Sequence, residues 1–167
     1  MLIAFAASEG LQFHQVDVKS AFLNAPLVED VYLSVPQDLE LDRRCYFLKL
    51  KKAIYGLKQA LLAWYEHLKI GFHSCASDPC VFHRADKSPT WLYIHVDDIS
   101  IFGHDVTIFK EEIALEFDIK DFGPADLMLS IKINQFSNVI TLDQQHFAEP
   151  LVHLYGMADC KRPLPLL

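Results

Sequence analysis

The sequence is poor in cysteine, glycine and proline, and each shortage excludes a class of protein. Its 167 residues include 4 Cys, 6 Gly and 8 Pro, with no repeat of fixed period. So little Gly and Pro argues against a disordered or collagen-like chain. The cysteines form no CxxC pair, which argues against a secreted disulfide scaffold and favours a reduced, intracellular protein of the cytoplasm or nucleus.

Long apolar segments are also missing. No apolar run in the sequence approaches the ~20 residues that a membrane-spanning helix needs. The first residues are apolar, but they lack the basic residues of a signal peptide and reach an acid at Glu9. We therefore expect a protein without a membrane partner.

Positive charge is scarce. Lys and Arg number 15 against 22 Asp and Glu, which gives a formal net charge of −7, so any contact with a nucleic acid must be local. Six basic residues fall in positions 43–58, where no acid occurs: Arg43, Arg44, Lys49, Lys51, Lys52 and Lys58. This basic segment is either a nucleic-acid-binding patch or only a solvated cationic face.

Hydrophobic residues make up 51% of the chain, enough for the core of one domain. The hydrophobic periodicity predicts strands and helices in mixed order. The predicted strands are 11–18, 30–35, 45–50, 80–84, 90–96, 99–102, 127–133 and 138–142, and the predicted helices are 2–9, 57–70, 106–117 and 143–155. Because no regular βαβ rhythm is present, we expect an α+β fold with an antiparallel sheet. Trp64 is expected in its core.

Three acidic residues are placed where they could carry chemistry. Asp97 and Asp98 separate two apolar strands, and Asp17 lies near the end of another strand. Adjacent carboxylates repel each other unless a cation neutralises them, and three of them could hold two Mg²⁺ ions. The alternative is that Asp97 and Asp98 are only turn residues.

A second group of possible metal ligands has soft donor atoms. His73, Cys75, Cys80 and His83 suffice in number for a tetrahedral zinc site. Their spacing is irregular, however, so we interpret them as structural residues.

Several blocks of the sequence match one known family. The blocks are Gln15–Asn24, Val31–Pro36, Leu48–Ala60, Ala63–Tyr65, Gly71–Phe72, Asp78–Phe82, Val96–Asp98 and Gly156–Cys160. In order and approximate spacing they resemble the copia-type (Ty1/copia) retrotransposon reverse transcriptase, over about residues 2–165. The block Tyr55-Gly56-Leu57-Lys58-Gln59-Ala60 is the most specific of them.

The resemblance implies a polymerase palm and an RNA-directed DNA polymerase activity. Residues 1–167 would form a partial reverse transcriptase domain, with part of the fingers, a palm core at about 11–142 and the start of the thumb at about 143–167. The implied reaction is nucleotidyl transfer with two Mg²⁺ ions, or Mn²⁺ in their place. The implied partners are an RNA or DNA template with its primer, deoxynucleoside triphosphates and the remainder of a retrotransposon polyprotein.

The resemblance also assigns roles to single residues. Asp17, Asp97 and Asp98 match the catalytic, metal-binding aspartates of the family. Phe22 matches the bulky residue that excludes a ribose 2′-hydroxyl, and Gly56 with Lys58 matches contacts to nucleotide and template. Taken without the family, Phe22 would be a core residue and Gly56 a turn residue.

Some residues depart from the family pattern. His95 replaces the usual Tyr before Val-Asp-Asp, Leu61-Leu62 replaces Pro-Arg, Ala25 replaces Gly, and Ser130 stands where Gly is common. No Lys or Arg precedes Asp17, although the family has basic residues there that hold the triphosphate. We therefore expect a fragment or degenerate copy that by itself extends a primer at no useful rate. The alternative function is a non-catalytic palm remnant with at most weak nucleic-acid or protein binding.

Overall fold

The structure is a computed structural model. It describes residues 2–39, 41, 46–68, 71–85, 89–136, 139–157 and 159–160. Of the basic segment, Arg43 and Arg44 lie outside these residues, as do Ser137, Asn138 and the chain after Cys160.

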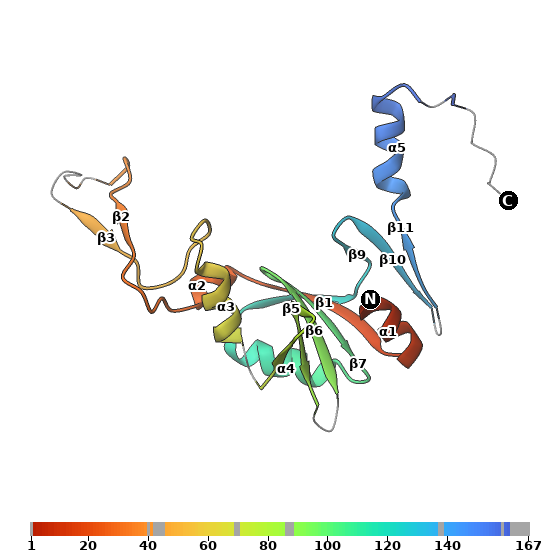
Figure 1. Cartoon of the computed structure of the whole chain (residues 1–167), viewed down its shortest axis with the longest axis horizontal. Coiled ribbons are helices and arrows are strands. Elements are labelled where there is room, and N and C mark those ends of the chain that lie inside the picture. The colour runs from red at the N-terminus through yellow and green to blue at the C-terminus, as the bar shows by residue number, and fades with distance from the viewer. Residues whose placement is uncertain are drawn as a thin grey trace.

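A six-stranded sheet occupies the middle of the described chain (Figure 1). Its order is β4 (His73–Cys75), β5 (Asp78–Arg84), β6 (Thr90–His95), β7 (Asp98–Gly103), β1 (Gln12–Val18) and β8 (Ile119–Pro124). Every neighbouring pair in it is antiparallel. Together with the helices, this sheet confirms the α+β class.

One face of the sheet is largely apolar, because side chains alternate between the two faces of a strand. Val16, Ile99 and Ile94 come from three neighbouring strands and pack in one buried cluster. Helices α3 (Ala60–Leu68) and α4 (Thr107–Glu116) add Trp64 and Phe109 to that cluster. Trp64 is completely buried, as predicted.

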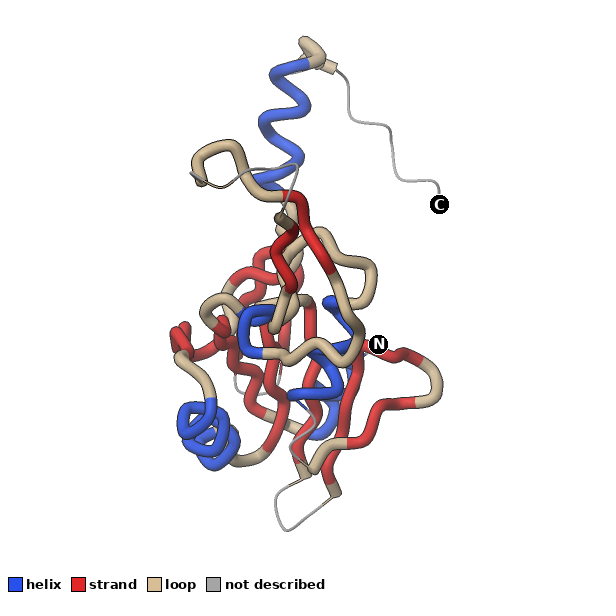
Figure 2. Tube along the Cα trace, turned by 90° about the vertical axis from the view of Figure 1, so that its left-hand side faces the viewer, coloured by secondary structure: helices blue, strands red, loops and turns tan. Residues whose placement is uncertain are grey.

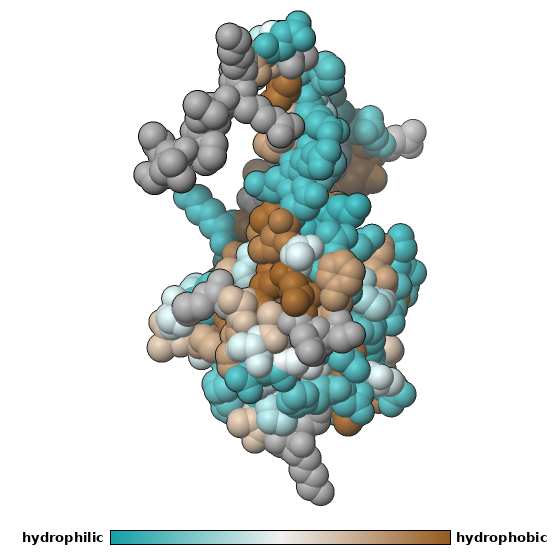
Figure 3. Space-filling view, turned by 90° about the vertical axis from the view of Figure 1, so that its right-hand side faces the viewer, coloured by the Kyte–Doolittle hydropathy of each residue, from teal (hydrophilic) through white to brown (hydrophobic). Residues whose placement is uncertain are grey.

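The opposite face of the sheet is aromatic at one end and acidic at the other. Phe13 and Phe102 stack on it with their ring centroids 4.3 Å apart. Helix α1 (Leu2–Glu9) and a three-stranded sheet cover this aromatic end. Figure 3 views the molecule from the side on which α1 lies, and hydrophobic side chains gather there. The strands of the smaller sheet are β9 (Leu127–Met128), β10 (Ile131–Phe136) and β11 (Val139–Asp143). The other end of the face carries Asp17 and Asp98.

Four further elements complete the described chain. The short helix α2 (Ala21–Asn24) follows β1, and β2 (Tyr32–Ser34) pairs with β3 (Phe47–Lys49) in an arm that extends away from the main sheet. Helix α5 (Gln145–Leu154) projects beyond the smaller sheet (Figure 2) and has no buried residue.

The sequence-based elements differ from the observed ones in a few places. The predicted strand 127–133 is interrupted, because Leu129 and Ser130 have φ of 49° and 62° and form a turn between β9 and β10. The alternating pattern continues across this turn and therefore concealed it. Strands β4 and β8 and helix α2 were not predicted. Strand β4 and helix α2 have only three and four residues, which is too short for a periodic pattern, and the sequence of β8 shows little periodicity.

Candidate functional site

The register of two strands brings the first aspartate to the other two. In the antiparallel pair of β1 and β7, Asp17 lies directly opposite Asp98. Opposed residues of such a pair point to the same face of the sheet. The carboxylates therefore share the open, polar end of that face, although 81 positions separate them along the chain.

Asp97 lies in the two-residue turn between β6 and β7, and this turn is held from two sides. The indole Nε1 of Trp64 donates a hydrogen bond of 2.7 Å to the carbonyl oxygen of Val96. The amide of Val18 donates to the carbonyl oxygen of Asp97 at 2.9 Å. Val96 has a φ of 60°, which is unfavourable for a β-branched residue. Contacts from α3 and β1 thus keep a strained turn in place.

Tyr55 is a member of this site that the sequence analysis did not identify. Its hydroxyl donates to Oδ2 of Asp97 at 2.5 Å. Burial, the hydrogen bond to Asp97 and the negative charges of Asp97 and Asp17 raise the pKa of Tyr55 to about 12. The hydroxyl is therefore protonated and remains a donor at neutral pH. The only signal in the sequence was the position of Tyr55 at the start of the most specific family block.

Phe22 packs against Tyr55. Their ring centroids are 4.5 Å apart at an interplanar angle of 59°, and Phe22 is 7% exposed and belongs to the main core cluster. Phe22 is thus a core residue, and it also borders the site.

Gly56 and Lys58 follow Tyr55 in the loop before α3. Gly56 has a φ of +92°, and a Cβ atom there would meet nothing within 4 Å. Its lack of a side chain is therefore required by the backbone conformation and not by a close protein contact. Lys58 is exposed. A contact of either residue with a nucleotide or template remains a prediction.

The electrostatics of the aspartates favour a cation. The pKa of Asp17 is raised, first by burial and then by the charges of Asp98 and Asp97, while Lys120 acts in the opposite direction. Repulsion of this kind falls when a cation joins the carboxylates. The donors are all carboxylate oxygens, the ligand type that Mg²⁺ prefers, and in this respect they fit the ion.

In the structure, the side chains of the three aspartates are not grouped closely enough to hold a metal ion together. Within the described residues, no three or more His, Cys, Asp or Glu side chains are grouped so as to hold a metal ion. The three aspartate side chains would have to turn toward one another to share one. Their backbone positions allow this, because two are cross-strand partners and the third is adjacent in sequence.

The alternative zinc ligands have other partners. His73 and His83 are paired across β4 and β5, and Nδ1 of His83 lies 3.1 Å from the carbonyl oxygen of His73. The hydroxyl of Tyr65 donates to Sγ of Cys80 at 3.6 Å. These contacts support the structural interpretation of the group.

A polar cavity of about 480 Å³ adjoins Asp98. It is lined by residues of β1, β6 and β7 and of the segment from β8 to the β9 turn: Gln15, His95, Asp98, Phe122, Asp126, Leu127, Leu129 and Ser130. His95, which replaces the family's usual Tyr, lies opposite Asp98 across β6 and β7. The cavity thus lies beside the carboxylate of Asp98.

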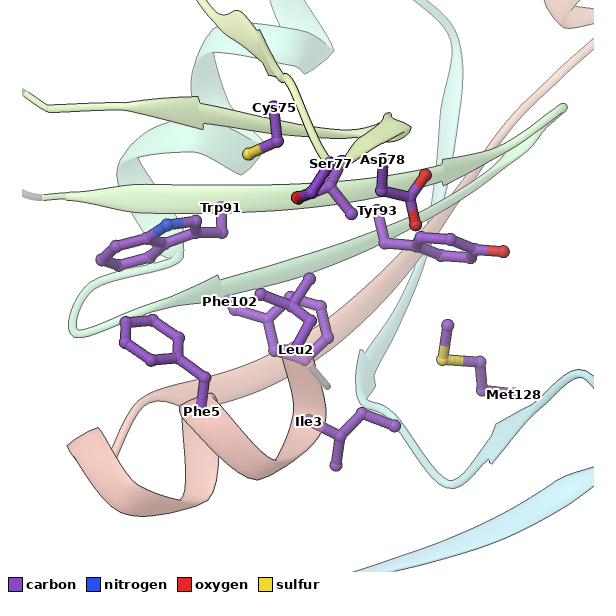
Figure 4. A pocket seen from close by; sticks show the side chains of 11 residues that line it. Leu2, Ile3, Phe5, Cys75, Ser77, Asp78, Trp91, Tyr93, Phe102 and Met128 are labelled. Carbon is purple, nitrogen blue, oxygen red and sulfur yellow. The ribbon is translucent and has the colours of Figure 1, made fainter.

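A second cavity, of about 530 Å³, lies at the aromatic end of the same sheet face (Figure 4). Phe5 and Ile3 of α1 line one side of it, and Trp91 and Tyr93 of β6 line another. Along β6, Trp91 and Tyr93 thus border this apolar cavity, whereas His95 borders the polar one.

Comparisons with known proteins identify the family of the chain. A family profile described as "Reverse transcriptase (RNA-dependent DNA polymerase)" matches residues 1–165. The chain belongs to the copia-type reverse transcriptases. The chain is 33% identical to the Retrovirus-related Pol polyprotein from transposon TNT 1-94 of Nicotiana tabacum, over 96% of this chain and 13% of that protein.

Two further relatives of this reverse transcriptase chain are similar to the same degree. The Retrovirus-related Pol polyprotein from transposon RE1 of Arabidopsis thaliana is 33% identical over 96% of this chain and 12% of that protein. The Putative transposon Ty5-1 protein of Saccharomyces cerevisiae is 33% identical over 79% of this chain and 46% of that protein. The chain thus spans only about an eighth of the length of the two plant polyproteins. No solved structure matches it.

The basic segment of this reverse transcriptase chain is partly neutralised by the fold. Lys49 forms an ion pair of 2.6 Å with Asp30, which β2 and β3 bring together, and both side chains are more than half exposed. Lys51, Lys52 and Lys58 are also exposed. As for membranes, none of the helices in the described ranges is long and apolar enough to cross one.

Proposed function

We propose that this chain is an RNA-directed DNA polymerase domain, which adds deoxynucleotides to the 3′ end of a primer on an RNA or DNA template. The observation that carries the proposal is the cross-strand pairing of Asp17 with Asp98, next to Asp97 in the turn. Three carboxylates on neighbouring backbone positions are what a two-metal nucleotidyl transfer requires. Membership of the reverse transcriptase family supports the same reaction.

In this proposal Asp17 and Asp97 are the primary ligands of two Mg²⁺ ions, or Mn²⁺, and Asp98 is a weaker ligand or orients the others. When bound, the ions supply activation of the primer hydroxyl and stabilisation of the leaving pyrophosphate. The protein contributes fixed positions. Trp64 and Val18 hold the turn of Asp97 by hydrogen bonds, and such positioning accounts for much of the catalysis of phosphoryl transfer.

Phe22, Gly56 and Lys58 would contact the substrates. Phe22 would restrict the sugar site, because it borders the aspartates through Tyr55. Gly56 and Lys58 would contact the nucleotide and the template. Residues of about 11–142 would form the palm, with part of the fingers before it and the thumb beginning near residue 143, within a longer polyprotein.

Primer extension tests the proposal. The purified chain, in excess over a radiolabelled oligo(dT) primer on poly(rA), should add nucleotides slowly in the presence of Mg²⁺ and not in EDTA. Asp97→Asn and Asp17→Asn should abolish the addition. Asp143→Asn is the matched control, since Asp143 lies on β11 and caps Gln145, a contact that Asn can also make. Addition that survives Asp97→Asn would contradict the proposal.

A non-catalytic nucleic-acid-binding remnant is the second candidate. It is favoured by the absence, within the described chain, of a ready metal-binding group. The same assay distinguishes it, because a remnant would bind primer and template in a gel-shift experiment and add no nucleotide in Mg²⁺ or Mn²⁺.

The sugar-restricting role of Phe22 has its own test. Phe22→Ala should raise incorporation of ribonucleotides relative to deoxyribonucleotides. Since Phe22 is buried, this variant should also lose about 3 kcal/mol of stability, and the assay is therefore done at low temperature with the folded fraction checked by circular dichroism. An unchanged sugar preference in the folded variant would remove Phe22 from the site.

A further inference from the structure

Tyr55 connects two parts of the site that are otherwise separate. Its hydroxyl reaches Oδ2 of Asp97 at 2.5 Å, and its ring lies 4.5 Å from the ring of Phe22. The first contact leads to a proposed metal ligand and the second to the proposed sugar-restricting residue. The roles proposed above give Tyr55 no function of its own.

The fold presents Tyr55 to the site from outside the core. Gly56 follows it with a φ of +92°, a conformation that turns the chain between β3 and α3. Tyr55 is 54% exposed, so the surrounding core does not fix it. Its contacts with Asp97 and Phe22 are therefore important for its position, and for theirs.

The backbone and the side chain of Asp97 are held by different groups. Hydrogen bonds from Val18 and Trp64 fix the turn backbone, and the Tyr55 hydroxyl holds the carboxylate. A carboxylate has about four lone-pair sites. A hydrogen bond to one site on Oδ2 leaves Oδ1 free for a cation, so the contact is compatible with metal binding.

We propose that Tyr55 is a positioning residue, which orients the Asp97 carboxylate through its hydroxyl and supports Phe22 through its ring. This inference rests on the proposed function, because it assumes that Asp97 binds a metal ion. Hydrogen-bond partners that orient a metal ligand typically change metal affinity 10-fold to 100-fold. The hydroxyl and the ring should therefore have separable effects, one on metal affinity and the other on sugar preference.

Mn²⁺ binding is the first measurement. The electron paramagnetic resonance signal of free Mn²⁺ gives the dissociation constant for the full chain without substrate or turnover. Tyr55→Phe keeps the ring and removes the hydroxyl, and it should weaken Mn²⁺ binding about 10-fold or more. Tyr32→Phe is the matched control, since Tyr32 is similarly exposed and its hydroxyl lies 3.5 Å from an oxygen of Asp30; its Mn²⁺ affinity should equal that of the wild type.

Sugar preference is the second measurement. Tyr55→Phe should leave the ratio of ribonucleotide to deoxyribonucleotide incorporation unchanged, whereas Tyr55→Ala should raise it, because Phe22 loses its ring partner. Circular dichroism and urea denaturation establish that each variant is folded. Since Tyr55 is more than half exposed, neither substitution removes a core side chain.

The outcomes separate this inference from the function on which it rests. A wild-type chain that binds no Mn²⁺, or binds it equally well as Asp17→Asn, contradicts the proposed metal site itself. The positioning role of Tyr55 is overturned if the wild-type chain binds Mn²⁺ through Asp17 and Tyr55→Phe binds Mn²⁺ as tightly as the wild type or more tightly. That result leaves the proposed metal site intact.

Discussion

Asp17 and Asp98 face each other across two antiparallel strands, and their side chains lie on the same side of the sheet. Like charges at directly opposed positions destabilise a sheet. Gln15, whose Nε2 lies 3.4 Å from Oδ1 of Asp98, and Lys120 compensate only in part, because burial and the charges of Asp98 and Asp97 still raise the pKa of Asp17. The pair therefore costs stability in the free protein, as expected of a site arranged for a cation.

Replacement of Asp17 by Asn should stabilise the metal-free fold. A raised pKa means that the folded state binds more protons than the unfolded state, so the wild type gains stability as the pH falls through the window just above 3.8. At pH 7 the charged pair persists, and Asp17→Asn should raise the free energy of unfolding by ~0.5 kcal/mol or less, since solvent screens the charges. Urea denaturation at pH 7 and pH 4.5 measures this difference. A less stable variant at pH 7 would contradict it.

Trp64 should be the main support of the Asp97 turn. Trp64→Phe removes the indole donor of the 2.7 Å bond to Val96 and leaves a partly buried carbonyl oxygen without that partner. We expect a loss of about 2 kcal/mol in the free energy of unfolding. Trp91→Phe is the control, because Trp91 is half-buried and contacts Phe5 edge-on. Equal losses in the two variants would show that the hydrogen bond is unimportant.

His14 should make the fold sensitive to acid. Nζ of Lys110 lies 2.7 Å from Nδ1 of His14 and 2.7 Å from Oδ1 of Asp121, so His14 accepts a hydrogen bond in its neutral form. Burial and the charge of Lys110 lower the pKa of His14, against an opposing effect of Asp121. Below pH 6.5 the unfolded state therefore binds more protons than the folded state, and stability falls until the pH passes the lowered pKa.

His14→Gln should reduce that loss, since Gln can still accept from Lys110 without titrating. Urea denaturation at pH 7.5 and pH 5.0 should show a smaller difference in the variant than in the wild type. His104→Gln, at an exposed histidine, should behave as the wild type. An undiminished loss in His14→Gln would exclude His14 as its cause.

The turn between β9 and β10 should accept glycine with a gain in stability. Leu129 and Ser130 both have positive φ, and a two-residue turn with both central residues in this region favours Asn-Gly. Ser130→Gly should therefore raise the free energy of unfolding by ~0.5–1 kcal/mol. Ser34→Gly in the exposed edge of β2 should lower it, because glycine weakens a strand. Thermal unfolding compares the two, and a destabilised Ser130→Gly would refute the assignment of strain.

The local pattern of the sequence was sufficient for most elements of the fold. Strands β1, β6 and β7 and helices α1, α3 and α4 were predicted because alternation and helical spacing depend on neighbouring residues alone. The turn at Leu129 and Ser130 was not predicted, because those residues carry no turn signal. The pairing of β9 with β10 forces them into positive φ.

For the site, the sequence by itself placed Asp97 at a bend, next to Asp98, and Asp17 near the end of a strand. Tertiary structure alone decided that Asp17 is the partner of Asp98, because pairing register is set by hydrogen bonds and packing between distant segments. It also placed the Tyr55 hydroxyl on Asp97. A periodic pattern in the sequence cannot indicate such a contact. The contact depends on how the exposed loop of Tyr55 crosses the end of the sheet near Asp97, which is 42 positions further along the chain.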